Sequence, residues 1–255
     1  MKKLVSFVLA VVLAASLLPV QVWGATVVDS GECGADGGNV TWTLDSDGVL
    51  TIEGTGEMKD YTANVSVPWY SQRDNIKDVQ IQEGVTSIGD WAFELCSSLT
   101  SVSIPDSVTT IGCDAFSNCS SLTSVTIPDS VTSIGEGAFF DCYSLTSVSI
   151  PDSVTTIGRA AFHYCSSLTS VTIPNSMTHI EAGTFAYCKN LANIKIPESV
   201  VFIGNSAFSY CHSLTSILTS ADCTIEIGYA AYTMKTKVDT ATAVLQQNCA
   251  AAISP

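Results

Sequence analysis

The chain has 255 residues, of which 24 are acidic and 10 are basic, and its formal net charge is −14. This length allows one large or two modest domains. Its acidity argues against nucleic-acid binding and against binding to anionic lipid surfaces, because both would repel it.

Residues 1–24 have the composition of a secretory signal peptide. Lys2 and Lys3 precede the apolar run LVSFVLAVVLAASLL, and Val-Trp-Gly at residues 22–24 suits a cleavage site. An N-terminal membrane anchor is the alternative, but about fifteen apolar residues are short of the roughly 20 that a spanning helix needs. Cleavage would leave 8 basic and 24 acidic residues, a net charge of −16, and no later hydrophobic span. We therefore expect an extracellular protein, secreted or associated with a cell surface, without an integral membrane span.

Residues 25–75 are not repeats and are predicted to form an N-terminal β-rich cap. Within them, TWTLDSDGVLTIEG has alternating apolar residues on both sides of Asp-Ser-Asp-Gly at residues 45–48. This pattern is typical of a β-hairpin. We expect Pro68, Trp69 and Tyr70 to pack beneath the hairpin.

A 23-residue repeat fills residues 76–232, with isoleucines at constant spacing from Ile81 to Ile196. Its consensus is I-P-D-S-V-T-x-I-G-x-x-A-F-x-x-C-x-S-L-T-S-V-x. Periods of about 20 to 29 residues with an L-x-x-L-x-L core are typical of leucine-rich-repeat solenoids. Six full copies are followed by IGYAAY at residues 227–232, interpreted as a degenerate seventh copy. Residues 233–255 match no repeat and are predicted to be an atypical C-terminal tail.

Each copy is predicted to contain one short strand and one short helical turn. The β-branched residues of L-T-S-V-x-I favour a strand, and the following proline ends it because proline has no N–H to donate. In G-x-x-A-F-x-x-C, small, aromatic and thiol residues lie near helical spacing. One copy cannot bury enough apolar surface alone, so the copies must stack. The predicted fold is a leucine-rich-repeat solenoid of short parallel β-strands and short helical turns, with an N-terminal β-hairpin cap.

Stacking predicts two ladders of side chains in the core. Stacked strands lie about 4.8 Å apart, within the range for disulfides. The Cβ vectors of the repeat cysteines should nevertheless run parallel into the core, which predicts buried, reduced thiols. The phenylalanine ladder comprises Phe93, Phe116, Phe139, Phe162, Phe185 and Phe208. The cysteine ladder comprises Cys96, Cys119, Cys142, Cys165, Cys188 and Cys211.

Four cysteines lie outside the cysteine ladder. Cys33, Cys113, Cys223 and Cys249 can pair in three ways, and closeness along the solenoid favours Cys223 with Cys249 and Cys33 with Cys113.

The fifth copy has Glu181 in place of glycine and Thr184 in place of alanine. A residue with a Cβ costs roughly 1–2 kcal/mol in a left-handed conformation. Either the backbone at residue 181 has negative φ, which we favour, or this repeat is strained.

The residue pattern does not point to catalysis, a cofactor or a metal site, so we predict that the protein is not an enzyme. His163, His179 and His212 occupy three different repeat positions and form no catalytic arrangement. One row of side chains after the strand is expected to be a solvated turn, with weak divalent-cation binding along its acidic edge as the alternative. It comprises Glu83, Asp106, Asp129, Asp152, Asn175 and Glu198.

Two surfaces are candidate ligand-binding sites. Strand residues that point away from the core form hydroxyl-rich ladders on the usual binding face of a solenoid, although serine and threonine can also serve only to keep the sheet soluble. Tyrosines at one position in three consecutive repeats suit an interface or packing over the turns. The candidates on the inner face are Ser124, Ser147, Ser170, Asn193 and Lys195, and those on the flank are Tyr164, Tyr187 and Tyr210.

The repeat unit, together with the segment from Cys33 to Met58, resembles the BspA-like family of bacterial leucine-rich-repeat surface proteins. Members carry the unit I-P-x-S-V-T-x-I-G-x-x-A-F-x-x-C-x-x-L-T-S-V, and often a leading C-G…L-T-W-T-L-D-x-D-G-x-L-T-I-x-G-T-G-x-M. The resemblance spans residues 33–217. It implies extracellular binding of a protein or glycan on a host or neighbouring cell, with adhesion. The alternative is a structural or self-assembling envelope component without a specific ligand.

Overall fold

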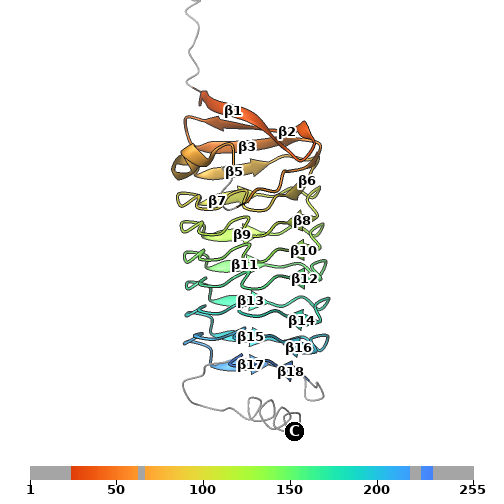
Figure 1. Ribbon diagram of the computed structural model, residues 1–255. Coiled ribbons are helices and arrows are strands. Elements are labelled where there is room, and N and C mark those ends of the chain that lie inside the picture. Colours follow the sequence, from red (N-terminus) through yellow and green to blue (C-terminus); the bar gives the residue numbers. More distant parts are fainter. Residues whose placement is uncertain (1–23, 63–66, 219–224, 232–255) are drawn as a thin grey trace, which may run out of the picture.

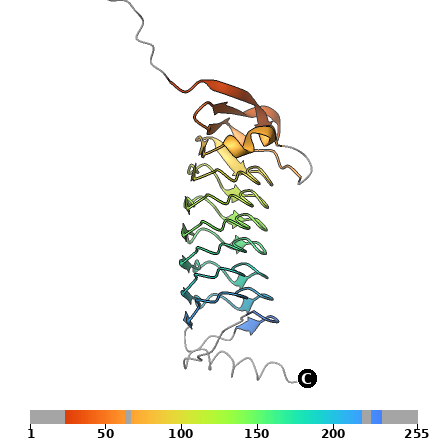
Figure 2. The ribbon, with the colours of Figure 1, turned by 90° about the vertical axis from the view of Figure 1, so that its left-hand side faces the viewer.

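The computed structural model describes residues 24–62, 67–218 and 225–231. Over these ranges the chain winds into one elongated stack of similar coils, closed at its N-terminal end by a larger β-structure (Figures 1 and 2). The predicted signal peptide up to residue 23 and the predicted C-terminal tail lie outside the described residues. No described segment forms an apolar helix long enough to cross a membrane.

The N-terminal cap contains three antiparallel strands, β1 (Val27–Gly34), β2 (Gly37–Asp45) and β3 (Val49–Gly54). β2 and β3 form the hairpin that the sequence predicts. The carboxylate of Asp45 accepts hydrogen bonds from the backbone N–H groups of Asp47 and Val49, both at 2.9 Å. These bonds hold the turn in place, as expected for an aspartate at this position.

The cap continues directly into the solenoid. β3 pairs in parallel with β5 (Asp78–Ile81), and β4 (Gly56–Glu57) pairs in parallel with β6 (Val85–Ile88). Residues 49–57 therefore form the first rung of both strand columns and present paired backbone groups to the coil that follows. Between β4 and β5 lies the 3-10 helix η1 (Tyr70–Asn75), the one helix among the described residues.

Each coil contributes two short parallel strands, one more than the sequence predicts. Residues in neighbouring coils pair at a separation of 23, for example Ser147 with Ser124 and Ser133 with Thr110. The first column contains β3, β5, β7 (Ser101–Ser103), β9 (Ser124–Thr126), β11 (Ser147–Ser149), β13 (Ser170–Thr172), β15 (Asn193–Lys195) and β17 (Ser216–Leu218). The second contains β4, β6, β8 (Thr110–Ile111), β10 (Ser133–Ile134), β12 (Thr156–Ile157), β14 (His179–Ile180), β16 (Phe202–Ile203) and β18 (Glu226–Ile227).

In place of the expected helical turn, the segment from the glycine to the cysteine forms a ladder of hydrogen-bonded turns. Backbone N–H groups of Asp114, Phe116 and Asn118 donate to carbonyl groups of the next coil at 2.7–2.8 Å. A helix would direct these donors along its own axis. Asp114 and Asn118 have φ of 50° and 62°, the left-handed region that costs a residue with a Cβ roughly 1–2 kcal/mol. Pairing between coils offsets that cost and replaces the helix.

The phenylalanine ladder lies in the centre of the coils, as predicted. All six rings are buried, and neighbouring rings stack with centroids 5.2–5.6 Å apart. Trp69 extends the ladder into the cap, because its ring stacks on Phe93 at 5.6 Å and meets Trp42 edge-on at 5.5 Å. One aromatic column therefore connects the cap to the last described coils.

The cysteine ladder is also present, with all six thiols buried and free. Each thiol from the second copy onward donates a hydrogen bond to the phenylalanine carbonyl oxygen of the preceding coil. The Sγ of Cys142 lies 3.1 Å from the oxygen of Phe116, and the Sγ of Cys165 lies 3.3 Å from that of Phe139. The predicted buried, reduced ladder is confirmed, and the thiols also connect coils.

The ladder thiols are expected to resist a bulky alkylating reagent in the folded protein at a pH of about 8.5, where an ordinary thiol is half ionised. Burial raises the pKa of Cys142 to about 12, so that its thiol stays protonated and enclosed. Mass spectrometry of the labelled peptides measures the reaction before and after denaturation without reductant. Partly exposed Cys113 is the positive control. Labelling of the ladder in the folded state, or failure to label it after unfolding, contradicts the assignment.

The expected pairing of Cys33 with Cys113 is wrong, because both thiols are free. Cys33 is only 2% exposed within the core of the cap, whereas Cys113 follows β8 at the partly exposed rim of the second column. Cys223 and Cys249 lie outside the described residues.

The irregular fifth copy is accommodated without left-handed backbone at Glu181, as favoured from the sequence. Glycine is usual at this position because neighbouring coils approach closely there. A Cβ on Gly158 would lie about 2.4 Å from the backbone nitrogen of Glu136. Thr184 is fully buried, and its hydroxyl donates a hydrogen bond to the carbonyl oxygen of Glu181 at 2.8 Å.

Candidate binding surfaces

The exposed side of the first strand column carries the inner-face candidates. Ser124, Ser147, Ser170 and Asn193 are register partners in consecutive strands, so they form one row along the stack. All four side chains are exposed, while the middle residue of each strand is buried. Lys195 is exposed in the neighbouring row, two residues further along β15. The structure thus brings these five residues onto one face.

The inner face changes in charge from one end of the stack to the other. Asp78 begins the row at the N-terminal end, where its carboxylate accepts a hydrogen bond from the hydroxyl of Ser101 at 2.5 Å. The middle coils present serine and threonine hydroxyl groups, and Lys195 adds a positive charge in β15. A ligand lying along this face would therefore meet a directional electrostatic pattern.

The acidic row at the end of these strands borders a hollow of about 660 Å³ whose lining includes Asp106 and Asp129. Its carboxylates accept hydrogen bonds from backbone N–H groups of the neighbouring turn. Glu83 accepts one from Asp106 at 3.3 Å, and Asp152 accepts one from Asn175 at 2.9 Å. No group of three acidic, histidine or cysteine side chains that could hold a metal ion occurs among the described residues. These contacts favour a turn-stabilising role over cation binding.

The three candidate tyrosines form a continuous stack on the flank. The ring centroids of Tyr164 and Tyr187 lie 4.3 Å apart, and those of Tyr187 and Tyr210 lie 4.4 Å apart. Tyr164 is 36% exposed and Tyr210 is 45% exposed. Desolvation of the Tyr187 hydroxyl, and then electrostatic interaction with Tyr164 and Tyr210, raises the pKa of Tyr187. Since the faces of the rings cover one another, their edges and hydroxyl groups are what the stack presents to solvent.

A second aromatic row supports this stack from the N-terminal side. His163 stacks on Phe140 at 5.1 Å with an interplanar angle of 2°, and it meets Tyr164 edge-on at 4.6 Å. Burial lowers the pKa of His163, which favours the neutral ring at neutral pH. Its Nδ1 atom is buried without a hydrogen-bond partner in the part of the chain that the structure describes. Phe140 and His163 occupy the same position in adjacent copies, 23 residues apart, and this equivalence is the sequence signal that could have predicted their contact.

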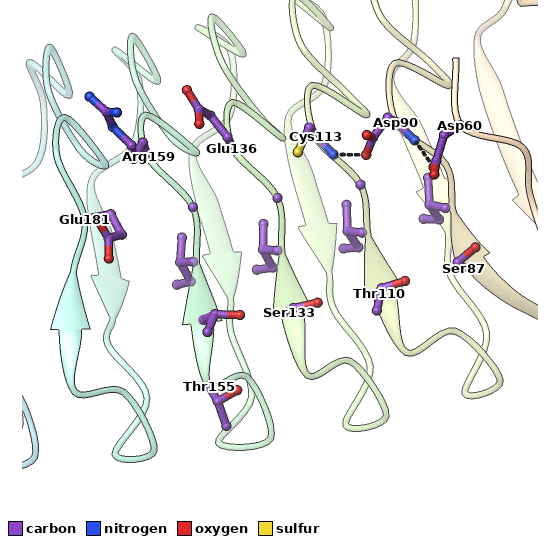
Figure 3. Close-up of a pocket in the computed structure, with 18 of the residues that line it drawn as sticks. Asp60, Ser87, Asp90, Thr110, Cys113, Ser133, Glu136, Thr155, Arg159 and Glu181 are labelled. Atoms are coloured by element: carbon purple, nitrogen blue, oxygen red, sulfur yellow. Dashed lines mark hydrogen bonds between the residues drawn. The ribbon is translucent and has the colours of Figure 1, made fainter. Parts of the chain in front are cut away.

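A third surface, which the sequence did not indicate, is a groove of about 780 Å³ along the second strand column (Figure 3). Hydroxyl side chains such as Thr110 and Ser133 lie on the strands, and Asp90, Glu136 and Arg159 lie on the turns that follow. The available signal was the residue after each I-G, which varies among aspartate, cysteine, glutamate, arginine, asparagine and tyrosine inside an otherwise constant stretch. The sequence did not predict the second strand of each coil, so these variable residues could not be placed on a surface.

Part of the groove's charged edge has a structural role. The carboxylate of Asp60 accepts a hydrogen bond from Asp90 N–H at 2.9 Å, and the carboxylate of Asp90 accepts one from Cys113 N–H at 2.5 Å (Figure 3). These side chains connect the cap to the first two coils. Glu136 and Arg159 lie further along the same edge.

Comparison with known proteins gives one matching family model and several similar structures. The model for the BspA type leucine rich repeat region, in six copies, matches residues 65–168 and 155–248. A leucine-rich repeat protein from Bacteroides ovatus ATCC 8483 has a TM-score of 0.64 and 28% identity, over 80% of this chain and 58% of its own. The T. pallidum leucine-rich repeat protein has a TM-score of 0.54 and 27% identity, over 69% of this chain and 87% of its own. The chain thus spans little more than half of the Bacteroides protein's length. No curated protein sequence matches it.

Proposed function

This chain belongs to the BspA-type leucine-rich repeat family, and on that premise we propose that it is a secreted or cell-surface binding module that recognises a protein or glycan. The solenoid acts as a rigid, non-enzymatic scaffold. Its repeated strands hold side chains at fixed separations, which lets an extended partner contact many coils at once.

One observation carries the proposal: at the C-terminal end, chemically distinct side chains break an otherwise uniform surface. The inner face is mostly serine and threonine, but Asn193 and Lys195 replace them in β15. On the flank, Tyr187 and Tyr210 stack at the same end of the molecule. Tyrosine combines large contact area with a hydrogen-bonding hydroxyl, as recognition surfaces require. The binding site is therefore centred on the coils that begin with β13 and β15.

The chemistry of this end favours a partner with acidic groups. Lys195 supplies a charge, and the tyrosine stack presents hydroxyl groups and ring edges, which carry partial positive charge. A partner that carries carboxylates, on protein side chains or acidic sugars, suits both surfaces. The partner lies on a host or neighbouring cell, where an exported protein encounters it.

A binding array of glycans and extracellular-matrix proteins, probed with the mature chain, identifies the partner. Against the partner so found, Lys195→Glu and Tyr187→Ser are each expected to weaken binding at least tenfold, about 1.4 kcal/mol. Charge reversal repels the acidic group, and loss of the middle ring disrupts the stack. The dissociation constants are measured by titration calorimetry.

Ser124→Glu is the matched control, because Ser124 lies in the same face as Asn193 but three coils closer to the cap. It is expected to have a smaller effect. Equal losses for all three variants indicate a footprint along the whole face, and unchanged affinity for Lys195→Glu and Tyr187→Ser contradicts the C-terminal site. Sedimentation velocity at increasing concentration separates this module from a self-assembling component, since a binding module stays discrete.

A further inference from the structure

The tyrosine stack has a geometry suited to a reaction as well as to contact. Among the described residues, its two ring pairs have the shortest centroid separations, 4.3 and 4.4 Å, with interplanar angles of 22° and 14°. Tyr187 is the middle ring, with Tyr164 stacked on one face and Tyr210 on the other. Near-parallel rings at this separation place the ring carbons beside the hydroxyl groups of adjacent tyrosines almost in van der Waals contact.

The backbone of the solenoid holds this arrangement. Tyr164, Tyr187 and Tyr210 share the same left-handed conformation, with φ of 62°, 61° and 61°. Tyr164 N–H donates to Ala186 at 2.9 Å, and Tyr187 N–H donates to Ser209 at 2.7 Å, so these two tyrosines are each bonded to the coil that follows. Because the dihedral angles and the bonds repeat, the three rings leave the backbone in the same direction. The rings are thus kept together by the fold and need no ligand to bring them together.

We propose that Tyr164, Tyr187 and Tyr210 form an oxidative modification site, where a haem peroxidase with hydrogen peroxide couples neighbouring rings into a dityrosine cross-link. Each phenol loses one electron and its hydroxyl proton to give a phenoxyl radical. Two radicals join through a new carbon–carbon bond between the positions beside their oxygens. Each of these carbons then loses its hydrogen, one proton returns to each oxygen, and both rings become aromatic again. One hydrogen peroxide is reduced to two water molecules.

Other oxidisable groups are placed less favourably. Tyr143 and Tyr229 are 49% and 86% exposed, yet no second tyrosine packs on either of them in the described ranges. A radical on either must meet another molecule to couple. The ladder thiols beside the stack, such as Cys188, are buried and bonded to carbonyl groups. Coupling within one chain is therefore expected at the stack first.

The cross-link would connect residues 23 positions apart in adjacent coils. Like a disulfide, it would restrict the unfolded chain more than the folded one, and so stabilise the coils that carry it. Tyr187 is a member of both pairs, so it controls both possible links. Oxidation would thereby strengthen the C-terminal coils of an exported protein outside the cell.

The test treats the folded protein at low concentration with horseradish peroxidase and hydrogen peroxide, and isolates the monomer by gel filtration. Dityrosine fluorescence in the monomer, and linked peptides lighter by two hydrogen atoms that contain Tyr164–Tyr187 or Tyr187–Tyr210, are expected. Tyr187→Phe keeps a stacking ring but has no phenol, so it should abolish both links. Tyr143→Phe, the matched control, should leave their yield unchanged. The melting temperature of the oxidised monomer should rise above that of the untreated one.

Three results would overturn the proposal. The first is dityrosine found only in covalent dimers. The second is an equal yield in the Tyr187→Phe monomer, which would place the link elsewhere. The third is an absence of dityrosine while an equimolar free-tyrosine control reacts in the same solution. Peptide mapping of the thiols confirms that cysteine oxidation does not account for the change in stability.

Discussion

Replacing Phe139 by alanine is expected to lower the free energy of unfolding by about 3–5 kcal/mol. Phe139 is fully buried, with Phe116 and Phe162 stacked on its two faces at 5.3 Å each. The coils cannot close the resulting cavity, because hydrogen bonds between them set their separation. Equilibrium denaturation in guanidinium chloride measures the loss.

The same change is expected to make unfolding less cooperative, since each coil is stabilised mainly by its neighbours. A cavity in the middle of the ladder weakens the connection between its two halves. Tyr143→Ala is the control, because Tyr143 lies four residues away and is 49% exposed; its effect should stay within about 0.5 kcal/mol. An unchanged Phe139→Ala unfolding curve would remove this residue from the core.

Replacing Trp69 by alanine should cost a similar amount, about 3–5 kcal/mol, and should act on the junction between cap and solenoid. Trp69 is fully buried, stacks on Phe93 at 5.6 Å and meets Trp42 at 5.5 Å. Its indole nitrogen also donates to the carbonyl oxygen of Ala92 at 3.0 Å. Limited proteolysis combined with equilibrium denaturation measures whether the cap opens before the coils unfold.

Trp69→Phe separates the ring from the hydrogen bond. It keeps an aromatic group in the ladder but leaves the Ala92 carbonyl without this donor, which should cost roughly 1–3 kcal/mol. Equal losses for phenylalanine and alanine would mean that the hydrogen bond, and not the ring, accounts for the contribution of Trp69 to the junction. No loss for alanine would show that the other contacts between cap and coils are sufficient without Trp69.

The two oxidisable ladders differ in how the chain places them. The cysteine follows the tyrosine directly in the three copies that carry one, yet the thiol of Cys165 is buried while the ring of Tyr164 is 36% exposed. The left-handed conformation of the tyrosine directs consecutive side chains to opposite sides of the coil. The same turn therefore protects the thiol and exposes the phenol.

Sequence periodicity by itself determined the stacking of coils and the composition of their core. A constant period of 23 forces equivalent side chains to repeat one position in every coil, so the ladders of Phe139 and Cys142 could be predicted without coordinates. The rows on the first strand column followed from alternation along a strand. The candidates Ser147 and Lys195 were placed on one face in this way.

The tertiary structure decided the features that depend on contacts between coils. β10 has only two residues, too few for a pattern, and it exists because β8 and β12 pair with it. The groove along the second column was missed for this reason. The turn that replaces the predicted helix depends in the same way on carbonyl groups of the next coil, as at Phe116. Local sequence determines which backbone groups need hydrogen-bond partners. Where those partners lie in another coil, the conformation of a short segment depends on the folded stack.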